Sequence, residues 1–306
     1  MATLVRPDIL RFRKAIRERA AERSQRRSRG VPVALPPSAA LTLYTGFLDR
    51  FSRDLDDAAR EVLKPYGLSF SSRRSDALDA LSDSHHTDRT DANDEDYLHP
   101  DHVAQIERDL RAAALRLAKD PKRLVIFSRV AQSVTAHTRE QWARQVKALL
   151  GIDLPKADPS LVKLMERFRR ENTDLIASLA KDHVERVHKV LKDAGSGTRV
   201  ETIRKQIQEQ TGAVRSRAQL IARDQVLSLN AQVTQERHKA AGVTEYIWRT
   251  SRDERVRERH KDLDGTRQRY DDPPVVDVRT GRREHAGQDF QCRCTAEPII
   301  PGFDSA

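Results

Sequence analysis

Apolar residues recur at three- and four-residue spacing over most of this 306-residue chain. The pattern runs through residues 41–63, 102–150, 161–191 and 213–241. Such spacing places apolar side chains on one face of a helix, whereas a half-buried strand needs strict alternation. Because the chain is 38% hydrophobic and 33% charged, its helices must carry much solvated surface. We therefore expect a mainly α protein with elongated helical arms.

The apolar period changes near the C-terminus. Gly242 is well placed to end the long helix, and Tyr246, Trp248 and Thr250 then alternate as in a strand. Further short strands are expected at 275–278 and 294–300, among proline, glycine and arginine residues. This pattern predicts a small α+β C-terminal domain after the helices.

Composition divides the chain into five segments. Residues 71–101 hold nine acids and few apolar residues, so they cannot bury enough surface to offset their ordering entropy. His85 and His86 lie in this stretch, where solvated linker histidines are a better interpretation than a metal site. The expected segments are a basic N-terminal arm (1–36), a helical segment (37–70), a flexible acidic linker (71–101), a helical domain (102–242) and the α+β domain (243–306).

Several helix boundaries follow from local signals. Asp158 followed by Pro159 predicts a helix start, and an interruption of that helix is expected at 172–174. Another long helix is expected from about residue 213. A capping box of Ser251 and Glu254 predicts the start of a short helix.

The N-terminal arm carries most of the net charge. Residues 1–30 hold ten Arg/Lys and three acids, which is +7 of the total +10. A helix is expected at 7–27, and its cations could contact packaged DNA without reading sequence. Alternatively, the apolar stripe of Ile9, Leu10, Phe12 and Ile16 could dock onto an acidic groove of a partner. The candidate binding residues of the arm are Arg11, Arg13, Lys14, Arg17, Arg19, Arg23, Arg26, Arg27 and Arg29.

Two classes of location are disfavoured by the sequence. No apolar run approaches the ~18 residues that span a bilayer. The first 30 residues lack an apolar stretch followed by a cleavage site, so no secretory signal is expected. The two cysteines, Cys292 and Cys294, are too close together for an ordinary disulfide, so nothing in the sequence suggests an oxidising compartment.

The C-terminal third contains motifs in a specific order. These are LIARDQ (Leu220–Gln225), AAGVTEYIWRTSRDERVRERHKDLDG (Ala240–Gly265), DDPPVVD (Asp271–Asp277) and HAGQDFQCRCTAEPI (His285–Ile299), with NTDLIASL (Asn172–Leu179) upstream. Together they resemble the phage Mu protein F-like family of head morphogenesis, or minor head, proteins. The resemblance implies structural roles for nine motif residues: Arg223, Trp248, Asp253, Arg255, His260, Gly265, Cys292, Arg293 and Cys294.

The resemblance implies a function that composition does not. Relatives are minor capsid proteins made with the portal and capsid proteins of tailed phages. We therefore expect a structural protein, not an enzyme, that bridges portal and major capsid proteins and touches packaged DNA through its arm. It would lie in the virion head or capsid after assembly in the host cytoplasm, in several copies arranged by partner symmetry, with no membrane contact.

Four residues of the C-terminal domain could hold one structural zinc ion. His260, His285, Cys292 and Cys294 offer two imidazoles and two thiolates, and a domain with so small a core would gain from a metal. Against this, the two cysteines are separated by one residue, and some relatives carry Cys-x-x-Cys where this chain has Arg257 and His260. The alternative is that both cysteines are buried apolar residues and the histidines make ordinary hydrogen bonds.

A metal-dependent nucleic-acid enzyme is the rival function. His260 could act as a base beside Asp253 and Asp264, although a charge-rich run of this kind usually forms a solvated face or an ion-pair network. Tyr246 and Trp248 could stack on bases, but packing in the domain core is the simpler expectation. A helical DNA-binding module without a capsid role is the third interpretation.

Overall fold

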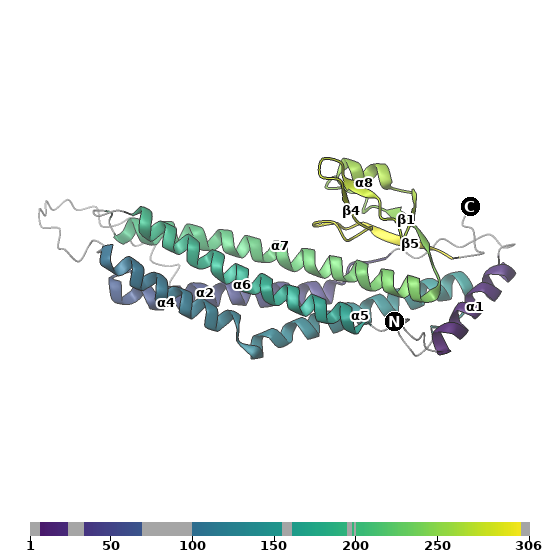
Figure 1. Cartoon of the computed structure of the whole chain (residues 1–306), viewed down its shortest axis with the longest axis horizontal. Helices are drawn as coiled ribbons and strands as arrows, with labels where there is room; N and C mark the ends of the chain where they lie inside the picture. Colours follow the sequence, from purple (N-terminus) through teal and green to yellow (C-terminus); the bar gives the residue numbers. More distant parts are fainter. Residues whose placement is uncertain are drawn as a thin grey trace, which may run out of the picture. The chain divides into compact units, whose positions relative to one another are not determined.

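The computed structural model describes residues 7–23, 34–68, 100–154, 161–194, 198 and 200–300. Its helices are α1 (Pro7–Arg23), α2 (Ser38–Leu63), the 3-10 turn η1 (Lys64–Tyr66), α4 (Pro100–Ala118), α5 (Pro121–Leu150), α6 (Val162–Asp193), α7 (Val200–Ala241) and α8 (Glu258–Leu263). The strands are β1 (Glu245–Arg249), β2 (Arg267–Arg269), β3 (Val275–Asp277), β4 (Arg282–Arg283) and β5 (Thr295–Ile299) (Figure 1). The predicted mainly α class with a small α+β C-terminal region is confirmed.

Contacts group the chain into two compact units that are not consecutive in sequence. One unit combines residues 1–45, 125–172 and 220–306, and the other combines 46–124 and 173–219. The long helices α2, α5, α6 and α7 each contribute residues to both units. Each unit therefore combines parts of several predicted segments, because helices that are distant in sequence pack together.

The second unit is built from apolar faces of α2, α4, α6 and α7. Its buried residues include Phe51, Leu55, Ile106, Leu110, Val184, Val187, Ile203 and Ile207. Polar contacts join the same helices: Arg217 on α7 lies 3.0 Å from Asp182 on α6, and His188 on α6 lies 3.3 Å from Glu107 on α4. The apolar spacing read from the sequence is thus the packing face of a helical bundle.

The first unit contains the C-terminal sheet and its main core. Strand β1 lies between β2 and β5, with both pairs antiparallel, while β3 and β4 form a separate hairpin. Tyr246 and Trp248 on β1 are fully buried in this core. They therefore have the packing role that the sequence favoured over base stacking.

Helix α1 is part of this same core. Phe12, Ile16 and Ala20 pack in one cluster with Trp142 and Leu149 of α5 and with residues of the sheet. Ile9 is also buried, whereas Leu10 is 52% exposed. Most of the apolar stripe is therefore covered by the chain itself and is not available to dock on a partner.

Several helices differ from the sequence-based expectations in their continuity or in where they begin. Helix α6 runs without interruption through Asn172, whose buried amide donates to the Phe168 carbonyl and accepts from the Tyr44 hydroxyl. The helix start predicted at Asp158 falls outside the described residues. The same holds for the acidic linker at 71–101, including His85 and His86, except that Pro100 and Asp101 begin α4. Helix α8 starts at Glu258 instead of after Ser251, because Asp253 uses its carboxylate in a turn with the Arg255 amide.

Helix α7 is longer than expected because it passes through Gly212. The sequence predicted a helix start near residue 213, but the structure has a single helix over Val200–Ala241. It ends as predicted at Gly242, which has φ +88° and donates its amide to the Lys239 carbonyl. The Val243 amide donates to His238, which completes a Schellman motif.

Gly212→Ala is expected to stabilise the chain by about 0.5–1 kcal/mol, because alanine loses less backbone entropy than glycine in an exposed helix. A Cβ at this position meets no atom within 4 Å. Chemical denaturation monitored by circular dichroism measures the change. Gly242→Ala is the matched control and should destabilise, since its φ of +88° disfavours a side chain. A loss of stability in Gly212→Ala would contradict a continuous helix.

Candidate metal centre in the C-terminal region

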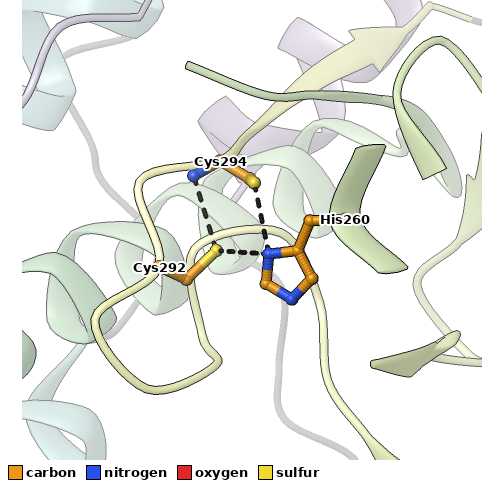
Figure 2. A group of neighbouring side chains, drawn as sticks. All are labelled: His260, Cys292 and Cys294. Carbon is orange, nitrogen blue, oxygen red and sulfur yellow. Dashed lines mark hydrogen bonds between the residues drawn. The ribbon is translucent and has the colours of Figure 1, made fainter. Parts of the chain in front are cut away.

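Three side chains with metal-binding atoms meet in the first unit, where the His260 ring packs against Trp248 of β1. His260 comes from α8, while Cys292 and Cys294 lie on either side of Arg293 in the turn before β5. We call these three residues the Cys–His cluster. Their ligand atoms lie within 4.8 Å of one another, and all three residues are buried (Figure 2).

The His260 ring is oriented by a buried carboxylate. Its Nε2 lies 3.1 Å from Asp289 Oδ2, and its Nδ1 lies 3.6 Å from both the Cys292 and the Cys294 sulfur. A proton on Nε2 can donate to Asp289, which leaves the Nδ1 lone pair directed at the two sulfurs (Figure 2). The ring is therefore held in the tautomer that a metal ligand needs.

Asp289 is itself fixed by two arginines. Arg257 lies 2.9 Å from one carboxylate oxygen, and Arg282 lies 2.6 Å from the other. The Asp289 side chain is 1% exposed, so these charge-assisted hydrogen bonds offset the cost of burying its charge. Arg257 thus supports His260 through the carboxylate that both residues contact.

The two thiols are in unequal environments. The backbone amide of Cys294 donates to the Cys292 sulfur over 3.4 Å. The pKa of the Cys292 thiol is lowered to about 5, mainly by a hydrogen bond from the Cys294 thiol and against the effect of burial. The pKa of Cys294 is raised because its thiol donates that bond and is buried, while the Trp248 indole acts in the opposite direction. The Cys294 amide and thiol both donate toward the Cys292 sulfur, so this environment favours the thiolate of Cys292.

The turn that carries the cysteines is anchored to α7. The Gln291 amide donates to Asp224 Oδ1 over 2.7 Å, and the Gln291 side chain donates to the Leu220 carbonyl over 2.7 Å. Gln291 has φ +52°, a left-handed conformation uncommon for a residue with a side chain. Gly287 approaches α7 so closely that a Cβ there would lie 2.8 Å from Ala231 Cβ. These contacts fix the cysteine positions relative to the helix.

A small cavity borders the Cys–His cluster. It has a volume of about 150 Å³ and is lined by all three cluster residues. Four arginines also line it: Arg223, Arg255, Arg257 and Arg293. The cluster therefore faces a strongly cationic space on one side and the apolar core on the other.

Comparison with known proteins finds a family match for the part of the chain that holds this cluster. Residues 185–297 match the family described as Phage Mu protein F like protein. We call this stretch the Mu F-like region. An "Uncharacterized protein" of Haemophilus influenzae (strain ATCC 51907 / DSM 11121 / KW20 / Rd) is 32% identical over 169 residues, which is 54% of this chain and 36% of that relative. The chain thus spans about a third of that relative's length. No solved structure matches the chain.

The structure gives physical roles to the motifs of the Mu F-like region. In LIARDQ, Arg223 lines the cavity and Asp224 anchors the cysteine turn, while Gln225 accepts a hydrogen bond from Asn172 over 3.0 Å. Gly265 has φ +77° and donates its amide to the Trp248 carbonyl over 2.8 Å. The motifs therefore hold α7, β1 and the cysteine turn together.

His285 does not lie in the Cys–His cluster of the Mu F-like region. Its Nδ1 lies 3.1 Å from the Tyr246 hydroxyl, and its ring packs edge-on against Tyr246 and Tyr270. Burial lowers its pKa to about 4, so it is neutral near pH 7. The structure thus places His285 in the aromatic core, apart from the other three residues of the arrangement considered from the sequence.

The carboxylates of the nuclease hypothesis have structural partners. Asp253 pairs with Arg293 at 2.6 Å, and Asp264 accepts the Thr250 amide over 2.8 Å. His260 is 2% exposed with both ring nitrogens facing other groups. Among the described residues, Asp253 and Asp264 are not gathered with His260 into a metal-binding group. The carboxylates stabilise turns around β1 instead.

The structure also divides the predicted arm residues. Arg13 donates to the Ala240 carbonyl over 2.6 Å and to the Lys239 carbonyl over 3.0 Å, so it caps the end of α7. Arg11, Lys14, Arg17 and Arg19 are exposed on α1, and Lys14 lies 3.7 Å from Glu18. The Arg23 side chain and all of Arg26, Arg27 and Arg29 fall outside the described positions.

Four functional neighbours of the cluster were missed by sequence reasoning. Asp224, Asp289 and Gln291 were noticed only as members of motifs, and Arg282 lies outside the quoted motifs. Their roles depend on contacts between residues far apart in the chain, such as Asp224 with Gln291. The left-handed φ of Gln291 is a further feature that only coordinates reveal.

Proposed function

We propose that this chain is a minor head protein of a tailed phage, which bridges portal and capsid proteins during head assembly. The observation that carries the proposal is the match of residues 185–297 to the Phage Mu protein F-like family, whose members act in head morphogenesis. The protein would work by binding, in several copies set by partner symmetry. It would assemble in the host cytoplasm and remain in the head. Within the described ranges, no helix is long and apolar enough to cross a bilayer.

Co-expression with the portal and major capsid proteins of the same phage tests this proposal. The full chain should co-purify with at least one of them through affinity capture and size exclusion, at the mass of a defined complex. Capture should survive nuclease treatment, which separates protein contact from shared DNA binding. A free chain that binds neither protein would contradict the bridging role.

The exposed cations of α1 support a DNA contact. Arg11, Lys14 and Arg17 recur along the helix at three-residue spacing on the side that the buried Phe12 and Ile16 leave in solvent. Charges in this arrangement can neutralise phosphates of packaged DNA without reading its sequence. Arg13 is excluded from this role because it caps α7.

Changing Arg11, Lys14 and Arg17 together to glutamate should weaken DNA binding and lower its salt dependence. Removing three phosphate contacts is expected to reduce the slope of log K against log salt by up to about 2.7. Fluorescence anisotropy with duplex DNA at several salt concentrations measures the slope. Lys181, Lys189 and Lys192 of α6, also exposed, provide a control triple variant with the same change in net charge. Equal effects of the two triple variants would show that no specific surface is used.

A metal-dependent nucleic-acid enzyme is the second candidate, and the arginine-lined cavity beside the Cys–His cluster favours it. Asp253 and Asp264, the carboxylates first considered for this enzyme, instead make structural contacts, which weakens the enzyme hypothesis. Incubation of purified chain with plasmid DNA and added Zn²⁺, Mg²⁺ or Mn²⁺ distinguishes the functions. We expect no cleavage, and cleavage that disappears in His260→Ala would establish the enzyme instead.

A further inference from the structure

We propose that His260, Cys292 and Cys294 bind one zinc ion, with the fourth coordination position open to the arginine-lined cavity. The three ligand atoms converge from two separate segments and lie within 4.8 Å of one another. Each residue is at most 6% exposed, so bulk water does not surround the three ligand atoms. This inference goes beyond the head-protein function and does not depend on it.

The spacing of the ligand atoms fits a tetrahedral zinc ion. Zn–S bonds of about 2.3 Å and Zn–N bonds of about 2.0–2.1 Å, at a tetrahedral angle, place sulfur and nitrogen about 3.6 Å apart. His260 Nδ1 lies 3.6 Å from the Cys292 sulfur and 3.6 Å from the Cys294 sulfur. Two equal distances of this size are what a shared ion requires. Cys292 and Cys294 would meet the ion from one side of a tight turn. A separation of one residue therefore does not prevent the two sulfurs from sharing an ion.

The groups around the cluster are those that support a zinc–thiolate site. Asp289 accepts from His260 Nε2, an arrangement that orients a zinc-bound imidazole. The Cys294 amide donates to the Cys292 sulfur. The Trp248 indole N–H is buried, and no described residue accepts its hydrogen bond. A Cys294 thiolate would give it an acceptor.

Ordinary hydrogen bonding explains the cluster less well. The Nδ1 lone pair of His260 can accept one strong hydrogen bond, yet two thiols face it at the same distance. Two thiolates and one imidazole suit zinc better than calcium or magnesium, which prefer oxygen ligands. The surrounding elements are short, with five residues in β1 and six in α8. A metal would tie α8 to the cysteine turn where the core is small.

The fourth position faces the cavity. Among the described residues, no further histidine, cysteine or carboxylate joins the cluster, and three protein ligands with an open position are typical of zinc that binds a small ligand. Arg223 and Arg255 line the cavity, and neither has an ion-pair partner in the described part of the chain. The fourth ligand is therefore water or an oxyanion such as inorganic phosphate.

Metal analysis of the full chain, purified without a metal-binding tag, is the first test. We expect about one zinc per chain, and replacement by Co²⁺ should give intense tetrahedral d–d bands with a thiolate-to-cobalt charge-transfer band. The cysteines provide a second measurement without any variant, because the chain has only two. Both thiols should react with a thiol reagent only after a chelator is added. Substoichiometric metal after reconstitution, or thiols that react equally without chelator, would overturn the site.

Variants identify the ligands. Cys292→Ser and His260→Gln should lose the charge-transfer band or the tetrahedral bands, whereas His285→Gln should retain both. His285 is the matched control because it is a buried histidine of the same region outside the cluster. Loss of metal in His285→Gln, with a folded chain by circular dichroism, would contradict the three-ligand assignment.

Inorganic phosphate tests the open position. Added phosphate should shift the d–d bands of the cobalt-loaded chain, and Arg223→Gln with Arg255→Gln should weaken this phosphate affinity about tenfold, the loss expected for a charge-assisted hydrogen bond. Cobalt bands that respond to neither phosphate nor thiocyanate would show that the fourth position is closed.

Discussion

Ile16→Ala is expected to lower the free energy of unfolding by about 3 kcal/mol, within the range for truncating a buried isoleucine. Ile16 is 1% exposed and packs in the same cluster as Trp142 and Trp248. Removing its side chain leaves a cavity where α1 meets α5 and the sheet. Urea denaturation followed by tryptophan fluorescence measures the loss, since both tryptophans of the chain lie in this core.

Leu10→Ala is the matched control for this prediction. Leu10 lies on the same helix but is 52% exposed, so its truncation should change stability by no more than about 0.5 kcal/mol. Equal effects of the two variants would mean that α1 is not part of the folded core. The comparison also bears on function, because deleting the whole arm would remove Phe12 and Ile16 from the core. DNA binding is therefore better tested by charge reversal than by deletion.

Gly287→Ala is expected to cost about 2–5 kcal/mol and to disturb the Cys–His cluster. Gly287 has φ +83°, where a side chain costs roughly 1–2 kcal/mol. An added Cβ would also lie 2.8 Å from Ala231 Cβ and 2.9 Å from the Cys294 carbonyl oxygen, which adds overpacking of about 1–3 kcal/mol. Relief of this overlap requires the cysteine turn or α7 to move, which displaces Cys294 relative to α7.

Gly265→Ala separates the two causes. Gly265 has φ +77°, but a Cβ there meets nothing within 4 Å, so only the backbone cost of roughly 1–2 kcal/mol applies. Thermal or urea unfolding of both variants, with cobalt absorption as a report on the cluster, measures the difference. A Gly287→Ala chain as stable as Gly265→Ala would contradict the close packing of the cysteine turn on α7.

Local sequence patterns predicted the elements of the fold but not their long-range contacts. The apolar period of Leu43, Phe47, Phe51 and Leu55 correctly indicates α2, and the alternation at Tyr246 and Trp248 correctly indicates β1. Both patterns reflect burial of one face, which neighbouring residues encode. The helix start expected near residue 213 was wrong, because the packing of α7 outweighs the cost of Gly212 in its interior.

The candidate site was predicted only in part, because its contacts also join residues that are far apart in the sequence. His260, Cys292 and Cys294 were found from residue type alone. His285 was grouped with them but lies in the aromatic core, because residue type does not say which side of the core a loop faces. The burial of Phe12 and Ile16 was also not foreseen, since an apolar stripe looks the same whether its own chain or a partner covers it. Asp289 and Asp224 act across 29 and 67 residues of sequence.

The most direct test of the head-protein function is electron microscopy of lysates from a phage that encodes this chain and carries a stop codon early in its gene. The proposed function predicts that DNA-filled heads are lost or strongly reduced, and that supplying the wild-type chain in trans restores them. Normal numbers of filled, infectious heads without the protein would contradict a role in head morphogenesis.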